Sequence, residues 1–487
     1  MKRIIIIILV LLALLVVYTV FNQFDAGPAV FDVGKEGLKT TSLPELLQSI
    51  FKPPSFDKTN GYYRLWTLTE PAGVDIESDD VLLRYRRLHD PQFDTEKYVK
   101  EWNDSGDAWN IDKDNRGNGN YTEFYTKWKA GLEKSSDWTT PPVNIQEDWG
   151  KVILEEKSHL LEMKSEFQLI LDRYQKLIDT EFFEDFTLVT RNSLAIYNSP
   201  VPNLLAWLHA AKLYVAVNML DAMEGNWEQG VSNILAHIAL NKKAVRTSRT
   251  LIVNLIGKAC VRMSLQALDS LMNRKECPRE VFQQVVDGLP PIMQEEFGNS
   301  NQLLAEGFSI SQSPLKESGL FFQPNRTQQY YYDFFAGLYR ADITPPYQWK
   351  SNPLEIEPVV KGLFWWLQNP AGKLKFQAFL NENIAKNLFV ASFKGYAVKT
   401  FYDMTRIAAA LHLNYTPGTP VKEILNGLEI YRELPDPCSG NPYIWNDEKQ
   451  ILYSIGFDKV DNGGGDSTRY KQIEGVDFAI PVVLYVK

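Results

Sequence analysis

The sequence predicts a mainly α-helical protein that follows an N-terminal transmembrane helix and ends in a small antiparallel β element. Three observations predict this fold class: an apolar N-terminal run, helical spacing of apolar residues through the middle of the chain, and strand-like runs at its end. We divide the chain into a transmembrane anchor (1–24), an irregular, aromatic-rich exported region (25–145), a multi-helix domain (146–430) and a small β element with an acidic, glycine-rich loop (431–487).

The first element is the anchor. Lys2 and Arg3 precede an apolar run from Ile4 to Phe21, and the next charge is Asp25. About 18 to 20 helical residues cross the ~30 Å of bilayer hydrocarbon, so the run is long enough to span. The cationic end should stay in the cytoplasm and the rest should be exported. The alternative is a cleaved signal peptide, whose apolar region is typically about 7 to 15 residues long. The longer run favours a retained anchor.

The exported region 25–145 combines aromatic residues, prolines and Asn/Asp/Gly, which predicts loops and short helices with at most one hairpin. Within it, Asp112, Asp114, Gly117 and Glu123 occupy positions 1, 3, 6 and 12 of an EF-hand loop. Arg116 stands where the fifth position needs an oxygen ligand, and its charge would repel the ion. We therefore favour a solvated turn over a calcium site here.

In the helical domain, apolar residues recur at helical spacing from Trp149 to Ile178 and predict one amphipathic helix. The break Glu224-Gly225-Asn226 predicts a hairpin between two of the helices that follow. The further predicted helices are Leu204–Met223, Trp227–Val245, Leu251–Met272, Val281–Met293, Tyr330–Tyr339, Val359–Gln368 and Leu374–Leu413.

Small residues surround the predicted hairpin. Ala222, Gly225, Trp227 and Gly230 resemble a helical-repeat hairpin of the tetratricopeptide sort, although the chain shows no regular 34-residue period. Two interpretations remain: the small residues let two helices approach closely, or the hairpin forms part of a peptide-binding groove. We favour the first. The aromatic clusters Tyr330–Tyr332 and Phe364–Trp366 leave the same choice between core packing and a groove, and we favour core packing.

The β element is predicted from three strand-like runs, Tyr443–Trp445, Ile451–Ile455 and Phe478–Val486, which should form a small antiparallel sheet. The loop 456–466 between the last two runs is rich in glycine and aspartate. Calcium takes six to eight oxygen ligands, and glycines let backbone carbonyls turn toward an ion. The candidate ligands are Asp458, Asp461, Asp466 and Asp477. A purely structural Gly/Asp turn remains the alternative.

A resemblance bears on this choice. The segment Asp436–Tyr443 (DPCSGNPY), then Leu452–Asp458 (LYSIGFD), a Gly-Gly pair and a late Asp477 resemble the C-terminal end of major pseudopilins of type II secretion. In that family a DPWGxPY segment and a YSxGxDG segment frame a calcium site. The resemblance covers only about the last 55 residues. The whole arrangement also resembles a group of uncharacterised bacterial envelope proteins, which have this architecture and no assigned activity.

The resemblance implies calcium ligands at Asp458 and Asp477, with Asp461 as a looser match, and these three residues are our predicted metal site. Lys459 replaces the family's glycine after the first aspartate, and Cys438 stands in the segment where the family has tryptophan. The N-terminus also lacks the Gly-Phe-x-x-x-Glu processing signature, so the chain is not itself a pilin subunit. The bacterial resemblance places the anchor in an inner membrane and the bulk of the chain in the periplasm.

Composition excludes some functions. The chain has 487 residues, 45% of them hydrophobic, which suits a globular protein with substantial cores. The net charge of −9 carries no basic cluster beyond the first three residues, so nucleic acid is not an expected partner. The three cysteines, Cys260, Cys277 and Cys438, do not make a disulfide framework. A bridge between Cys260 and Cys277 is the alternative to the two structural thiols that we favour.

Catalytic motifs give little support to an enzyme. The sequence has no GxSxG elbow, no phosphate-binding loop and no HExxH. We expect most histidines to be surface or capping residues, and Cys438 to be an inert thiol. The acidic pairs Glu155/Glu156 and Glu295/Glu296 are typical of a solvated helix face. The five histidines are His89, His159, His209, His237 and His412.

These observations favour a membrane-anchored periplasmic binding or scaffold protein, whose helical domain holds a protein partner in the cell envelope and whose terminal loop binds calcium. The alternative is an envelope hydrolase that uses a carboxylate pair in a helical cleft.

Overall fold

The computed structural model describes residues 18, 27–32, 34, 39–40, 50, 56–70, 72–88, 126–131, 139, 148–187, 202–293, 296–311, 321–349, 360–361, 368–464 and 477–485. The predicted anchor 1–24 except Tyr18, the acidic loop at 112–123 and most of the predicted helix Val359–Gln368 lie outside these residues.

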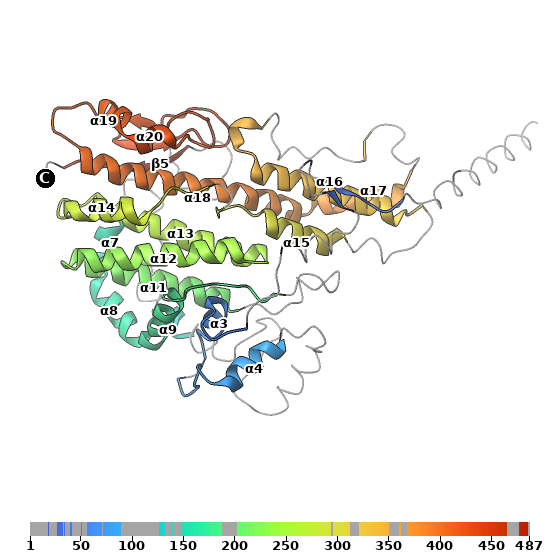
Figure 1. The fold of residues 1–487 in the computed structure, drawn as a ribbon, viewed down its shortest axis with the longest axis horizontal. Helices are drawn as coiled ribbons and strands as arrows, with labels where there is room; N and C mark the ends of the chain where they lie inside the picture. Colours follow the sequence, from blue (N-terminus) through green and yellow to red (C-terminus); the bar gives the residue numbers. More distant parts are fainter. Residues whose placement is uncertain are drawn as a thin grey trace, which may run out of the picture.

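Long helices stacked in rows form the centre of the protein (Figure 1). α13 lies between α12 and α18 and contacts both, and most of its side chains are buried. The predicted bounds of α11 and α13 are confirmed, and α12 extends two residues beyond its predicted end. The helices of this centre are α11 (Leu204–Met223), α12 (Trp227–Thr247), α13 (Leu251–Met272), α14 (Arg279–Gly288) and α18 (Asn383–Asn414).

The hairpin between α11 and α12 depends on its small residues. Gly225 has φ +113°, a conformation that favours glycine. A Cβ at Gly230 would lie 2.5 Å from the Asn218 carbonyl oxygen and 2.8 Å from the Ala222 Cβ, closer than side chains can approach. The small residues therefore let two helices pack closely, as we favoured from the sequence.

The helix predicted over Trp149–Ile178 is three shorter helices, α7 (Trp149–Glu155), α8 (Lys157–Glu166) and α9 (Gln168–Ile178). Glu156 and Phe167 leave the helical region at the two breaks, with ψ values of 11° and 22°. All three helices contact α11, and the breaks let the chain bend around it (Figure 1). The helical spacing of apolar residues correctly predicted helices here, but the prediction of one single helix was wrong.

Other predicted helices have different bounds. The stretch Leu374–Leu413 is divided by Glu382, with ψ 151°, into α17 (Pro370–Asn381) and α18. α16 (Pro324–Ile343) is longer than the predicted Tyr330–Tyr339 and begins at a proline, the favoured first helical residue. α14 ends at Gly288 instead of Met293, because Pro290 and Pro291 follow.

A second hydrophobic cluster lies beside the main one, and we call the elements around it the distal lobe. Tyr331, Phe335 and Phe376 are among its buried side chains. Phe457 packs against both clusters. The lobe consists of β1 (Phe31–Asp32), β2 (Lys39–Thr40), α15 (Ser300–Ser311), α16, η4 (Pro346–Gln348), α17 and the N-terminal half of α18.

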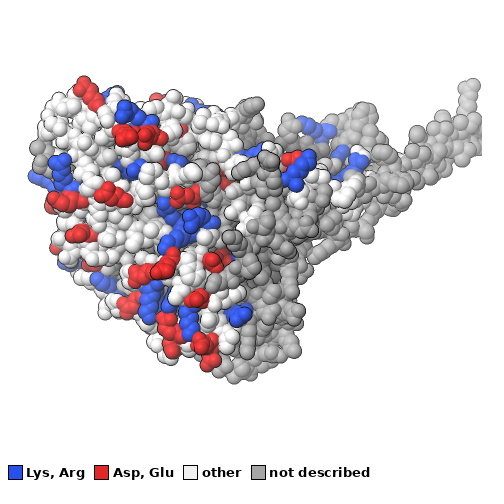
Figure 2. Space-filling view, viewed as in Figure 1, with Lys and Arg blue, Asp and Glu red and all other residues white. Residues whose placement is uncertain are grey.

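The rest of the described chain, which we call the body, has one main core. This core includes Tyr62, Trp66 and Tyr85 of the predicted irregular region and Tyr443, Leu452 and Ile480 of the predicted β element. α3 (Gly61–Trp66) packs against α9, and α4 (Asp79–Leu88) follows it. Lys and Arg intermingle with Asp and Glu over the visible face of the body, whereas Lys and Arg predominate on the visible part of the lobe (Figure 2).

The predicted antiparallel sheet is confirmed. β3 (Ile444–Asn446), β4 (Ile451–Ser454) and β5 (Phe478–Pro481) pair in that order, with Leu452 opposite both Trp445 and Ile480. The sheet packs on α18, where the rings of Phe401 and Phe478 lie 5.6 Å apart. It is preceded by α19 (Val421–Gly427) and α20 (Glu429–Glu433).

All three cysteines are buried free thiols, which confirms the favoured interpretation.

Among the described residues, α13 is the one helix long and apolar enough to cross a bilayer. Because 72% of its apolar window is buried inside the protein, α13 reads as a core helix.

Candidate metal site in the acidic C-terminal loop

The acidic loop leaves β4 through a sharp turn. Gly456 has φ +70° and Lys459 has φ +59°, so the lysine adopts the left-handed conformation that glycine favours. Lys459 stands where the resembling family has glycine, and it adopts a backbone conformation that favours glycine. Gly463 and Gly464, also at positive φ, bend the chain again before Asp477.

The first two predicted ligands are exposed and hold the loop locally. The Oδ1 of Asp458 accepts the backbone N–H of Val460 at 3.1 Å. The Oδ1 of Asp461 accepts the N–H of Gly463 at 2.8 Å and the hydroxyl of Tyr453 at 3.0 Å. Each carboxylate therefore uses one oxygen to fix the chain, and its other oxygen has no hydrogen bond within the described residues.

Asp477, just before β5, is fully buried. Its Oδ2 accepts the backbone N–H groups of Asn462 at 3.0 Å and Gly464 at 2.8 Å. Its Oδ1 is also buried and has no hydrogen-bond partner among the described residues. Buried carboxylate oxygens are normally satisfied, and an orphan of this kind suggests a water or an ion.

The electrostatics of the loop favour a cation. Burial raises the pKa of Asp477, the charges of Asp461 and Asp458 raise it further, and the two backbone N–H groups oppose them. Burial and the Asp461 carboxylate also raise the pKa of Tyr453 to about 12. A cation between these groups would relieve the repulsion that these shifts express.

The structure brings Asp461 and Asp477 together around Asn462–Gly464, with Asp458 at the start of the same loop. The buried orphan oxygen fits a metal ligand. However, no group of three carboxylate, imidazole or thiol side chains within the described ranges is placed to hold an ion. Asp466, the fourth candidate, lies outside the described residues, so calcium at this loop stays a prediction.

The two segments that carry the resemblance are joined directly. The Oδ1 of Asp436 accepts the N–H of Cys438 at 2.9 Å and the hydroxyl of Ser454 on β4 at 2.7 Å. This bond ties the first segment to the strand that begins the loop. Burial raises the pKa of Cys438 well above its usual value, which supports the inert thiol that we expected.

Sequence reasoning missed a fully buried histidine. The ring of His237 on α12 lies between Ser264 on α13, 2.6 Å from its Nδ1, and Tyr174 on α9, 2.8 Å from its Nε2. The Ser264 hydroxyl donates to the carbonyl of Cys260 at 3.1 Å. The ring Nδ1–H must then donate to Ser264, and Nε2 accepts from Tyr174. Burial lowers the pKa of His237 to about 3, so this neutral ring acts as a bridge between three helices.

A buried polar group also joins the body to the distal lobe. The side chain of Asn299, before α15, accepts from Lys258 Nζ at 2.5 Å and donates to Asp342 Oδ1 at 2.9 Å. Asp342 Oδ2 accepts the Asn299 backbone N–H at 2.7 Å. Burial lowers the pKa of Lys258 to about 7, although the charge of Asp342 opposes that shift. No motif could reveal this group, because its members lie far apart in the sequence.

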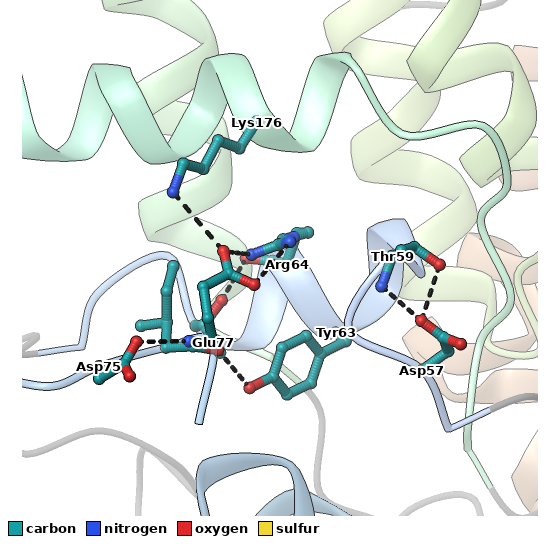
Figure 3. A network of polar contacts seen from close by, with 9 residues as sticks. Asp57, Thr59, Tyr63, Arg64, Asp75, Glu77 and Lys176 are labelled. Carbon is teal, nitrogen blue, oxygen red and sulfur yellow. Dashed lines mark hydrogen bonds and ion pairs between the residues drawn. The ribbon is translucent and has the colours of Figure 1, made fainter. Parts of the chain in front are cut away.

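A third polar network fastens the N-terminal part of the body to α9 (Figure 3). The two terminal guanidinium nitrogens of Arg64 donate to the carboxylate of Glu77, at 2.5 and 3.0 Å. Lys176 of α9 lies 3.5 Å from the same carboxylate. Arg64 holds the pKa of Glu77 below its usual value. The Glu77 carboxylate is therefore neutralised by the cations Arg64 and Lys176. This arrangement suits fastening the N-terminal segment to α9 and does not suit acid/base chemistry.

The acidic pairs considered for hydrolysis are occupied by other contacts where they are described. Glu155 is exposed and forms an ion pair with Lys151 at 3.7 Å, and Glu296 pairs with Lys242 at 3.1 Å.

In comparisons with known proteins, no family model, no curated protein and no solved structure matches this chain.

Proposed function

We propose that this protein is a membrane-anchored scaffold of the bacterial cell envelope, exposed to the periplasm, whose helical body holds a protein partner. The observation that carries the proposal is the apolar run from Ile4 to Phe21 behind Lys2 and Arg3. Its length suits one bilayer crossing and its flanking charges orient the chain.

The described fold supports a role in binding. The body has one main core of packed helices to which both the N-terminal segment and the C-terminal sheet are fastened. His237, a buried ionisable group of the body, is engaged in contacts between helices. Helical surfaces supported by a packed core suit protein recognition.

We propose further that the acidic loop binds calcium through Asp458, Asp461 and Asp477. The buried, unpartnered Oδ1 of Asp477 supports this assignment. The ion would then join β4 to β5 and have a structural role in the sheet, because the loop connects these two strands.

The scaffold role is tested by in vivo cross-linking followed by purification of the full chain from detergent-solubilised membranes and mass spectrometry. We expect one envelope protein to be enriched over a control in which an unrelated exported domain carries the same residues 1–24. Recovery of the full chain without any enriched partner, together with release of products from envelope glycan or peptide, would support the hydrolase instead.

A further inference from the structure

The tip of the distal lobe consists of Phe321 and the N-termini of α16 and α17, and it contacts the predicted anchor. Tyr18, in the last part of the apolar run, stacks on Phe321 with ring centroids 5.2 Å apart. Phe321 lies three residues before the start of α16. Its carbonyl also accepts the N–H of Ala371 in the first turn of α17 at 3.3 Å. The N-termini of both helices therefore lie next to the end of the predicted span.

This tip is rigid. Asn369, fully buried, accepts the Gln323 N–H at 2.8 Å and donates to the Thr327 hydroxyl at 3.0 Å, which joins the first turns of α16 and α17. One turn further along, the rings of Tyr331 and Phe376 are 4.9 Å apart. The two helices thus run side by side in the same direction, with both N-termini at the tip.

The charge of the tip is positive among the described residues. The first turns of α16 and α17 contain no acidic residue. Arg326 lies in the first turn of α16, and Lys373 and Lys375 lie in the first two turns of α17. Arg326 and Lys373 are close enough for the guanidinium to lower the pKa of Lys373, after the larger effect of burial. Two helix N-termini add further positive potential at the same end.

Leu374, between these two lysines, is 52% exposed. An exposed leucine between two lysines suits a bilayer surface, where the apolar side chain enters the interface and the ammonium groups reach lipid phosphates. Figure 2 shows Lys and Arg on the visible part of this lobe, in contrast to the mixed charge of the body.

We infer that the tip of the distal lobe is a lipid-binding surface, on which Leu374 enters the bilayer interface while Arg326, Lys373 and Lys375 bind anionic phospholipid headgroups. The occupant is lipid because Tyr18 joins this tip directly to the predicted membrane span. The inference rests on the proposed anchor, and it adds that the lobe is held against the membrane and does not move freely at the end of a tether.

The test uses the full chain with Leu374→Cys, labelled with an environment-sensitive fluorophore and reconstituted in nanodiscs. The three native cysteines are buried, so the folded protein should react at the new position only. We expect brominated lipid to quench the label, and more strongly when the disc contains anionic lipid. Leu169→Cys on α9, at a residue that is 42% exposed, is the matched control and should remain unquenched.

The charge contribution is tested with Lys373→Gln/Lys375→Gln in the same labelled chain. Each cation near an anionic surface is worth roughly a fivefold change in the docking equilibrium, so the pair should lower it by about 25-fold. The control double variant Lys151→Gln/Lys275→Gln, on the body, should have no effect. Quenching that is equal in zwitterionic and anionic discs would overturn the headgroup assignment.

The outcomes separate the two proposals. If alkaline washing releases the chain from the discs, the anchor is wrong and the proposed function fails. If the chain stays in the discs but the label at position 374 is not quenched, the anchor stands and the lipid-binding tip is wrong. An unquenched label that becomes shielded from soluble quencher only when cell-envelope proteins are added would assign this tip to a protein partner.

Discussion

At the scale of single residues, the most informative group is a carboxylate that is fully buried with one unpartnered oxygen. Asp477 is held by two backbone N–H groups, and the charges of Asp458 and Asp461 lie nearby. The sequence pointed to these three aspartates through a resemblance, and the structure places them in one loop. Their number and spacing could be predicted, but the burial of Asp477 could not, because it depends on the sheet that forms around it.

The loop predicts a calcium-dependent stability. Calcium that binds only the folded state should stabilise it by about 2.7 kcal/mol at a hundredfold excess over the dissociation constant. Asp477→Asn should remove this increase, whereas Asp287→Asn on α14 should retain it. Thermal melting with calcium and with chelator measures both. A midpoint that does not respond to either in the wild-type protein would contradict a stabilising site.

His237 predicts a pH dependence of stability. Its pKa is about 3 in the folded protein and about 6.5 when unfolded, so between these values the unfolded chain binds a proton that the folded chain excludes. The free energy of unfolding should therefore fall with acidification, by about 2 kcal/mol from pH 7.5 to pH 5.

Urea unfolding of the wild type and His237→Gln at the two pH values isolates this contribution. Burial raises the pKa of Asp269 to about 7, which stabilises the folded state on acidification. That opposite effect is common to both proteins and cancels in the comparison. The variant should lose less stability between pH 7.5 and pH 5 than the wild type, and equal losses would mean that His237 titrates normally.

At the scale of elements, apolar periodicity predicted where helices form better than where they break. α11 and α13 follow their predicted bounds, and both bury most of their side chains. The breaks at Glu156, Phe167 and Glu382 are marked by neither glycine nor proline, and those at Glu156 and Phe167 let the chain bend around α11. His237 was missed for a related reason, since its partners come from two other helices.

The α11–α12 hairpin predicts opposite effects of one substitution at two helical glycines. Gly230→Ala should destabilise the protein by about 1–3 kcal/mol, because the new methyl group would meet the backbone of α11. At Gly337 on α16 an added Cβ would have no atom within 4 Å outside the local helix backbone, so Gly337→Ala should stabilise the protein by roughly 0.5–1 kcal/mol. Chemical denaturation of both variants measures the difference. If both glycines respond alike, the close approach of α11 and α12 is wrong.

At the scale of the whole molecule, the body and the distal lobe meet through the polar group of Lys258, Asn299 and Asp342. Asn299→Leu would leave a buried lysine and a buried aspartate without their shared partner, at a cost of about 3–5 kcal/mol. Hydrogen exchange should show lost protection in α15 and α16, while α11 and α12 keep theirs. Asn233→Leu, which removes a half-buried bond to Asn218 in the body, should spare the lobe. Uniform loss across both parts would show that they unfold as one unit.

The central claim is that residues 1–24 cross a membrane and remain attached, because that places the scaffold, its calcium loop and its lipid-facing lobe in the envelope. The most direct test is the intact mass of the native protein in alkaline-washed membranes. We predict that the full 487-residue chain stays in the membrane pellet. Recovery in the soluble fraction of a shorter chain that begins beyond Phe24 would contradict the claim.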